Sequence, residues 1–175
     1  IQDDIITVGL RNGVSGETTC DHEKLLTVGI RGYMEECQKN IDNTVSTGKE
    51  DQEKIDYWTA CIIQCEGLIT YAHRMSEEAR RQAAVCRDEK RKKGLLTIAE
   101  NCMVVPENPP QTFQQALQMV WFAHVYFQIE VCTTACGFGR FDQYMWPYYK
   151  KDVIDEQNIT QEEALEMLEC FYLKA

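Results

Sequence analysis

The sequence predicts a mainly α-helical fold, and three observations support this expectation. Apolar residues recur at helical spacing through several long segments, polar or proline-containing clusters separate these segments, and Ser, Thr or Asp residues stand where helices would begin. The chain of 175 residues is 44% hydrophobic and 26% charged, which is sufficient for one hydrophobic core.

Two helices are expected in the first half of the chain. The first spans 21–45, with Asp21 or Thr19 as the candidate N-cap, because a side-chain oxygen there can accept from an unpaired backbone N–H. The polar linker 43–49 separates it from a long helix over 50–87, whose apolar residues line one side.

The next segment contains a basic cluster and a proline-rich connection. The cluster, 87–93, is interpreted as a solvated helix face or a helix junction that precedes a helix near 94–103. Pro106, Pro109 and Pro110 then impose an extended connection, since proline and the residue before it disfavour helix.

Two further helices carry N-terminal capping signatures. Thr112 precedes a helix over 113–130 and has Gln115 three residues later, which is the spacing of a capping box. Thr160 and Glu163 repeat this pattern at the last helix. The apolar spacing of that helix continues to the end of the sequence, so we expect the chain to be a segment of a longer polypeptide.

Charge and hydropathy exclude two classes of partner. The formal net charge of −10 would repel nucleic acid and anionic membrane surfaces. No apolar run approaches the roughly 20 residues that a membrane-spanning helix needs. The most apolar segment, 117–129, contains His124 and Gln128, so it is interpreted as a buried helix in which His124 is a core residue. His22, flanked by two acidic residues, is expected to be exposed.

Nine cysteines are present, without a secretory signal or a disulfide-scaffold spacing, which favours reduced thiols in a cytoplasmic protein. Cys61 and Cys65, like Cys132 and Cys136, are four residues apart, a spacing that on a helix would allow metal ligation. No CxxC pair or nearby histidine completes a ligand set, so we expect core cysteines and no metal site.

The segment 132–137, between the aromatic-rich helix and a tyrosine-rich turn, consists of small residues. Gly137 and Gly139 precede Asp142, which is expected to be buried. Glycine at these positions indicates a close backbone approach or a positive φ angle. The sequence therefore predicts the wall of a cavity here.

A set of short motifs carries a resemblance to a known family. The motifs are IAENC (98–102), VPENPP (105–110), TFQQALQ (112–118), WF (121–122), GRFDQY (139–144) and PYY (147–149) with Asp152, preceded by a weaker match at DHEKLL (21–26). In this order and spacing the chain resembles the pyruvate formate-lyase-like glycyl radical enzymes, which include glycerol and diol dehydratases, hydroxyproline dehydratases and choline lyases.

This resemblance implies a fold and a type of chemistry. The fold would be an α/β ten-stranded barrel, of which residues 1–175 form a single segment. The chemistry would use a glycyl radical that an S-adenosylmethionine and iron–sulfur activase installs, and a cysteine that this radical oxidises to a thiyl. The family's Gly-Cys-x-Glu and Arg-Val-x-Gly-Tyr motifs are absent from the sequence, and no bound cofactor is expected. We therefore expect the chain alone to be inactive. The resemblance also implies that the whole protein is a homodimer.

The resemblance also implies contacts with a small-molecule substrate. Glu17 stands where the dehydratases have a histidine, and its carboxylate is able to accept from a hydroxyl, bind an ammonium or, if burial raises its pKa, donate a proton. Some relatives place an anion-binding arginine four residues earlier, where this chain has Gly13. The second contact region comprises Thr134, Ala135, Cys136 and Gly137.

The turn Gly139, Arg140 and Asp142 is interpreted as structural, with Arg140 and Asp142 fixing the loop through hydrogen bonds to backbone.

The favoured function is radical cleavage of a C–O, C–N or C–C bond by a lyase, with a dehydratase-like elimination preferred because of Glu17. Formate C-acetyltransferase and arylacetate decarboxylase activities are alternatives within the family. From other classes, a non-catalytic helical interaction module and a thiol-based redox or metal module remain open.

Overall fold

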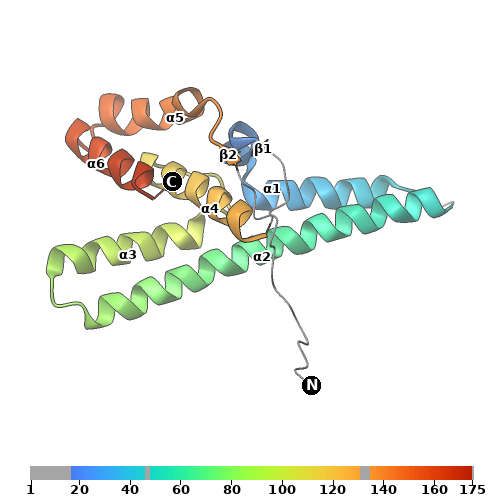
Figure 1. Cartoon of the computed structure of the whole chain (residues 1–175), viewed down its shortest axis with the longest axis horizontal. Coiled ribbons are helices and arrows are strands. Elements are labelled where there is room, and N and C mark those ends of the chain that lie inside the picture. Colours follow the sequence, from blue (N-terminus) through green and yellow to red (C-terminus); the bar gives the residue numbers. More distant parts are fainter. Residues whose placement is uncertain (1–16, 46–47, 131–134, 175) are drawn as a thin grey trace, which may run out of the picture.

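The computed structural model describes residues 17–45, 48–130 and 135–174, and within them the chain is mainly helical, as predicted (Figure 1). The elements in order are β1 (Glu17–Thr19), α1 (His22–Asn43), α2 (Lys49–Val85), α3 (Glu89–Val104), α4 (Phe113–Glu130), β2 (Ala135–Gly137), α5 (Phe141–Tyr149), the π-helix η1 (Lys150–Asp155) and α6 (Gln161–Tyr172). Among these residues no helix is both long and apolar enough to cross a membrane.

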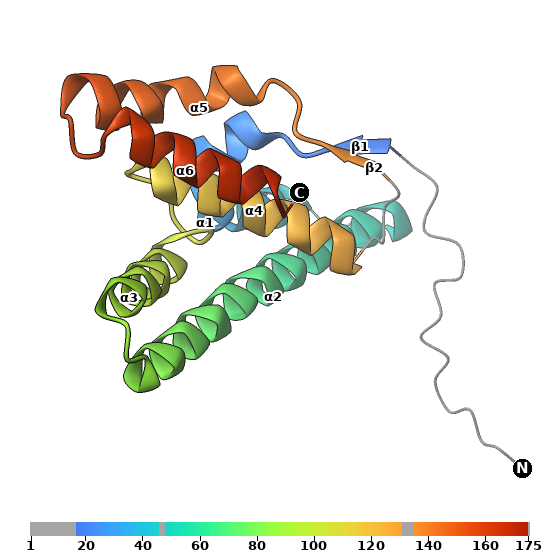
Figure 2. The ribbon, with the colours of Figure 1, turned by 60° about the vertical axis from the view of Figure 1, so that its left-hand side comes forward.

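The apolar helix α4 lies at the centre of the fold. Both views place α5 and α6 on one side of α4 and the pair α2 and α3 on the other (Figures 1 and 2). The core combines α4 with residues from five other helices and the proline connection, all of them buried: Leu25, Leu26, Ile30, Leu68, Ala72, Cys102, Val105, Phe113, Ala116, Leu117, Met119, Val120, Phe122, Ala123, Met145, Ala164 and Phe171. Removing this apolar surface from water is the main driving force for the arrangement.

The helix N-termini follow the predicted capping residues. Asp21 caps α1 by accepting from the Lys24 N–H at 3.1 Å. At α6 the Thr160 hydroxyl accepts from the Glu163 N–H, and the Glu163 carboxylate accepts from the Thr160 N–H, which is the complete capping box.

The start of α4 departs from the predicted capping box in one respect. The Thr112 hydroxyl accepts from the Gln115 N–H at 3.2 Å, as expected. The Gln115 side chain, however, accepts from the N–H of Gln111 rather than from that of Thr112. The box is therefore half formed, and Gln115 extends the cap one residue further into the connection.

Most of the basic cluster lies in the first part of a helix rather than before it. Helix α3 begins at Glu89, five residues earlier than predicted, because Asp88 caps it by accepting from the Arg91 N–H at 2.7 Å. The cluster 87–93 therefore forms the junction and the first turn of α3, and the interpretation as a solvated helix face or junction is confirmed.

Helix α1 is interrupted at Gly29, where φ is +67°. The interruption frees the N–H groups of Ile30 and Arg31, which donate to the carbonyls of Pro106 and Glu107 at 2.9 Å each. A Cβ atom at Gly29 would lie 2.7 Å from the Glu107 carbonyl oxygen. Glycine is therefore required here both for its φ angle and for this close approach.

Candidate functional site

The structure brings together the two segments that the sequence predicted to contact substrate. Strands β1 and β2 form a parallel pair in which Glu17 is opposite Ala135, Thr18 opposite Cys136 and Thr19 opposite Gly137. Strands more than 100 positions apart in the chain are therefore hydrogen-bonded neighbours. Thr134, Cys132 and Gly13 lie outside the described residues.

The two glycines of the predicted cavity wall both pack against Thr19. A Cβ atom at Gly137 would lie 3.3 Å from the Thr19 hydroxyl oxygen. Gly139 has a φ angle of +62°, and a Cβ atom there would lie 3.3 Å from the Thr19 methyl carbon. The expectation of close approach or positive φ is confirmed at both positions, and these glycines allow the chain leaving β2 to lie directly on β1.

The residues after Gly139 form a helix rather than the predicted turn, and Asp142 is exposed rather than buried. Arg140 is the N-cap residue of α5, and its guanidinium donates to the Gln143 side chain at 3.4 Å. The predicted side-chain hydrogen bonds to backbone are therefore not seen in the described part of the chain. Asp142 lies in the first turn of α5, where an acidic residue favours the positive end of the helix dipole.

Among the described residues, two tyrosines fix this region to the rest of the molecule. The Tyr144 hydroxyl donates to the Phe138 carbonyl at 2.7 Å, and burial raises the pKa of Tyr144. The Tyr148 hydroxyl donates to the Leu26 carbonyl of α1 at 3.1 Å. Both hydroxyls thus help to position the segment that follows β2 against α1.

A buried carboxylate anchors the other end of the same segment. Asp152 is 3% exposed, and its side chain accepts from the Phe113 N–H, at the start of α4, at 2.7 Å. It also accepts from the Asn158 side chain at 3.3 Å. Sequence reasoning placed Asp152 in the family pattern but gave it no role. No local spacing indicated this contact, because its two partners are 39 positions apart.

His22 is 3% exposed, so the expectation that it faces solvent was wrong. The rings of Tyr144 and Phe138 cover it, with centroid distances of 5.1 and 6.4 Å. Neither ring nitrogen has a hydrogen-bond partner among the described residues. Burial lowers the pKa of His22 to about 4. The charge of Asp21 raises this pKa and that of His124 lowers it, and both effects are smaller than that of burial. The imidazole is therefore neutral at physiological pH.

His124 is buried, as predicted, on the same aromatic cluster. Its ring stacks on Trp121 at 5.6 Å and lies 5.0 Å from Phe138, and burial lowers its pKa. The segments that follow β1 and β2 thus share one cluster of aromatic rings, formed around the neutral side chain of His22.

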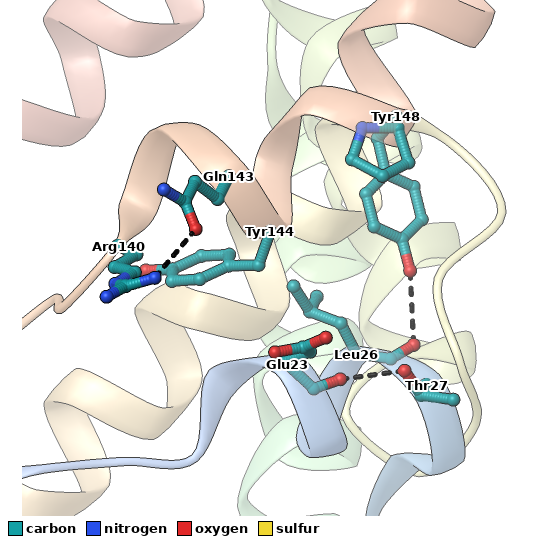
Figure 3. A pocket seen from close by; sticks show the side chains of 8 residues that line it. Glu23, Leu26, Thr27, Arg140, Gln143, Tyr144 and Tyr148 are labelled. Carbon is teal, nitrogen blue, oxygen red and sulfur yellow. Dashed lines mark hydrogen bonds between the residues drawn. The ribbon is translucent and has the colours of Figure 1, made fainter.

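A pocket of about 390 Å³ lies between α1 and α5 (Figure 3). Figure 3 shows the Tyr148 hydroxyl directed at Leu26 and the Arg140 guanidinium directed at Gln143. The pocket is lined by Glu23, Leu26, Thr27, Arg140, Gln143, Tyr144, Pro147 and Tyr148. Arg140 belongs to it, whereas Cys136 and Gly137 are not among its described lining residues. The pocket is therefore separate from the strand pair.

The described cysteines are all free thiols. Burial, reinforced by Asp21 and Cys136, raises the pKa of Cys20 to about 11, and burial also raises the pKa of Cys136. Both thiols are therefore protonated at neutral pH. Within the described part of the chain, no group of three His, Cys, Asp or Glu residues is arranged to hold a metal ion.

Comparison with known proteins gives a consistent result. The sequence profile of the family described as pyruvate formate lyase-like matches residues 1–175. Isethionate sulfite-lyase of Oleidesulfovibrio alaskensis is 41% identical over 155 residues, which cover 87% of this chain and 19% of the relative. Indoleacetate decarboxylase of Tractidigestivibacter scatoligenes is 37% identical over 166 residues, which cover 95% of this chain and 19% of the relative.

The fold is also found among solved structures. A structure described by 1,2-propanediol dehydration in Roseburia inulinivorans matches with a TM-score of 0.89 and 36% sequence identity, covering 93% of this chain and 20% of the other. The chain therefore spans about one fifth of the length of the relatives that it matches.

Proposed function

This chain belongs to the pyruvate formate lyase-like family, and we propose that the protein of which it is a segment is a glycyl radical lyase. The reaction would be a radical cleavage of a C–O, C–N or C–C bond in a small polar substrate, with dehydration favoured. The radical-bearing glycine and cysteine would lie outside these residues, and an S-adenosylmethionine-dependent activase would act on the whole protein. That protein would be a cytoplasmic homodimer, and this segment would supply scaffold and substrate wall.

The observation that carries this proposal is the register of the parallel strand pair, which places Glu17 opposite Ala135. Residues expected from separate motifs to contact one substrate are adjacent in space. Parallel strands occur almost only in sheets that are covered on both faces, and a pair of three-residue strands is too small to be stable alone. We therefore propose that β1 and β2 belong to the ten-stranded barrel of the complete protein.

Glu17 favours elimination from a hydroxylated or cationic substrate. A carboxylate at this position is able to accept a hydrogen bond from a departing hydroxyl or to pair with an ammonium group. The match to a structure described by 1,2-propanediol dehydration supports the first of these roles. Several relatives are named isethionate sulfite-lyase, and sulfite elimination was not among the reactions inferred from the sequence.

The decisive experiment compares two Glu to Gln variants of the full-length protein after anaerobic activation. Glu17→Gln should lower kcat/KM at least ~100-fold, the usual contribution of a positioned acid–base group. The control, Glu50→Gln, changes an exposed residue in the first turn of α2 and should stay within about twofold, as expected for a solvated surface charge. Unchanged kinetics for Glu17→Gln would exclude this residue from the substrate pocket.

Arylacetate decarboxylation is a second candidate. Ala135 and Gly137 are small residues, which we expect to leave volume at the wall for a bulky apolar group, and one relative is an indoleacetate decarboxylase. A substrate screen with diols, hydroxyproline, choline and arylacetates would separate the candidates. Turnover of an arylacetate, with none of a hydroxylated substrate, would favour this second function.

A further inference from the structure

Thr19, the last residue of β1, is an exposed threonine beside the predicted substrate wall. Its hydroxyl makes no hydrogen bond within the described part of the chain. It lies against β2, the parallel neighbour of β1 in both views (Figures 1 and 2). The sequence indicated Thr19 only as a candidate N-cap of α1, a role that Asp21 takes. Its hydroxyl is therefore not used by the fold.

Two glycines define the direction of the Thr19 side chain. Its hydroxyl oxygen lies 3.3 Å from where a Cβ atom at Gly137 would stand, and its methyl carbon lies 3.3 Å from the same position at Gly139. Each branch of the side chain thus lies over a glycine, and a β-branched side chain has few alternative rotamers. The hydroxyl is held on the side of β2, over a position without a side chain.

The residues that follow Thr19 and Gly137 show which face of the strand pair is exposed. Cys20 and Phe138 are half-buried and pack against the hydrophobic core. Because successive residues of a strand lie on opposite faces, Thr19 and Gly137, which are both exposed, lie on the face away from the core. Glu17, two positions before Thr19, shares this face by the same alternation.

We propose that the Thr19 hydroxyl binds the substrate next to Glu17, and that the two residues together select a diol. The inference rests on the proposed function, because it takes Glu17 as a substrate contact. An ionised carboxylate only accepts hydrogen bonds, whereas a threonine hydroxyl both donates and accepts. Positions two apart on a strand are separated by roughly 7 Å, so the two positions fit a small molecule with hydroxyl groups on neighbouring carbons.

The glycine opposite Thr19 separates this role from strand packing. A side chain at Gly137 would meet the Thr19 hydroxyl, so glycine leaves that hydroxyl open to a ligand. A threonine needed only for packing would be needed for its shape, and valine has nearly the same shape and an equally high preference for strands. Replacement by valine therefore removes the hydroxyl alone.

The test measures binding of 1,2-propanediol, the compound named for a similar structure, to the full-length protein before activation. Ligand-observed NMR titrations give the Kd of each variant. Thr19→Val should raise the Kd of the diol about fivefold, the contribution of one neutral hydrogen bond. Thr19→Ser keeps the hydroxyl and should stay within about twofold of the wild type. The Kd of 1-propanol should change by less than about twofold in Thr19→Val, because its one hydroxyl pairs with the charged Glu17.

Thr18→Val is the matched control, since it makes the same change one position earlier, on the other face of β1. It should leave the Kd of 1,2-propanediol within about twofold of the wild type. An unchanged Kd of the diol in Thr19→Val, an equal loss in Thr18→Val, or wild-type protein that does not bind the diol would overturn the inference.

Turnover after anaerobic activation tests the proposed function separately. Wild-type protein that binds the diol through Thr19 but cleaves none of the screened substrates would support the inference and refute the lyase reaction. If Glu17→Gln abolished turnover while Thr19→Val changed neither turnover nor the Kd of the diol, the inference would be refuted and the lyase reaction would stand.

Discussion

Two regions of the molecule are held together by different kinds of polar contact. In the hairpin arm (37–43 and 49–60), side-chain pairs join residues three or four positions apart: Gln38 with Asp42, Lys49 with Glu53, Lys54 with Asp51 and Gln52 with Asp56. In the junction (20–29, 104–113 and 137–152), hydrogen bonds join segments distant in the sequence, such as Tyr148 with Leu26 and Phe113 with Asp152.

The difference predicts where substitutions matter. The pairs of the arm are mostly exposed, and exposed pairs contribute about 0–1 kcal/mol each. The contacts of the junction are buried or half-buried, where losing one partner costs about 1–3 kcal/mol. The segment next to the candidate site is therefore fixed by tertiary contacts, and equivalent substitutions should have unequal effects in the two regions.

The largest effect is expected at Gly29, where the junction contacts α1. In Gly29→Ala a Cβ atom would lie 2.7 Å from the Glu107 carbonyl oxygen and 2.8 Å from the Asn108 carbonyl carbon, at a positive φ. Backbone on both sides has to move, so the free energy of unfolding should fall by ~3 kcal/mol or more. The midpoint of urea unfolding of the full-length protein measures this.

Gly94→Ala is the matched control. Gly94 lies inside α3, and a Cβ atom there meets nothing within 4 Å. Alanine favours helix over glycine, so this variant should gain up to ~1 kcal/mol. Equal destabilisation by both variants would show that the close approach at Gly29 is not what fixes α1.

A pH-dependent loss of stability is expected from His22. Its pKa is about 4 in the folded protein and 6.5 for the unperturbed group, so below pH 6.5 the unfolded chain binds the proton more strongly. Stability should therefore fall as pH decreases from 6.5 to 4, by at most about 3 kcal/mol. His22→Phe should flatten this slope in urea unfolding measured between pH 7 and pH 4.

A variant of the hairpin arm is the control for this pH dependence of stability. Gln38→Ala removes an exposed contact with Asp42 and no group that titrates in this range. It should keep the wild-type pH dependence. A His22→Phe protein whose slope equals that of the wild type would contradict the burial of an unpaired neutral imidazole.

Asp152→Ala should cost about 2 kcal/mol, because the Phe113 N–H at the start of α4 loses its buried acceptor. Asp155→Ala is the control, since Asp155 is exposed and pairs only with Lys150 among the described residues; its cost should be below ~1 kcal/mol. Calorimetric unfolding temperatures of the two variants provide the measurement. A larger shift for Asp155→Ala would reverse the proposed importance of the junction.

The sequence predicted what depends on local patterns. The positions of α1, α2, α4 and α6 and the caps at Asp21, Thr112 and Thr160 follow from spacing along one segment, and the structure confirms them. The start of α3 and the helix α5 were not predicted. The glycine requirement at Gly137 and Gly139 was also predicted, although its cause, the approach of Thr19, was not.

The parts that failed depend on tertiary contacts. His22 was taken as exposed because its neighbours in sequence are acidic, yet aromatic residues that follow β2 cover it. Asp142 was taken as buried, whereas the buried carboxylate of this segment is Asp152. The family motif contains both acidic residues, but the packing of η1 against the start of α4 decides that Asp152 faces inward. The substrate contacts of Glu17 and Cys136 stay predictions.

The smallest effect is expected at the segment that follows β2. Tyr144→Phe keeps the ring that covers His22 but removes the hydroxyl that donates to the Phe138 carbonyl, which should cost about 1 kcal/mol. Tyr172→Phe is the control, because Tyr172 is 56% exposed and its hydroxyl makes no hydrogen bond among the described residues, so its cost should be near zero. Urea midpoints distinguish the two. If Tyr144→Phe matched the control, the hydroxyl would not stabilise the segment that follows β2, and the cover over His22 would depend on aromatic packing alone.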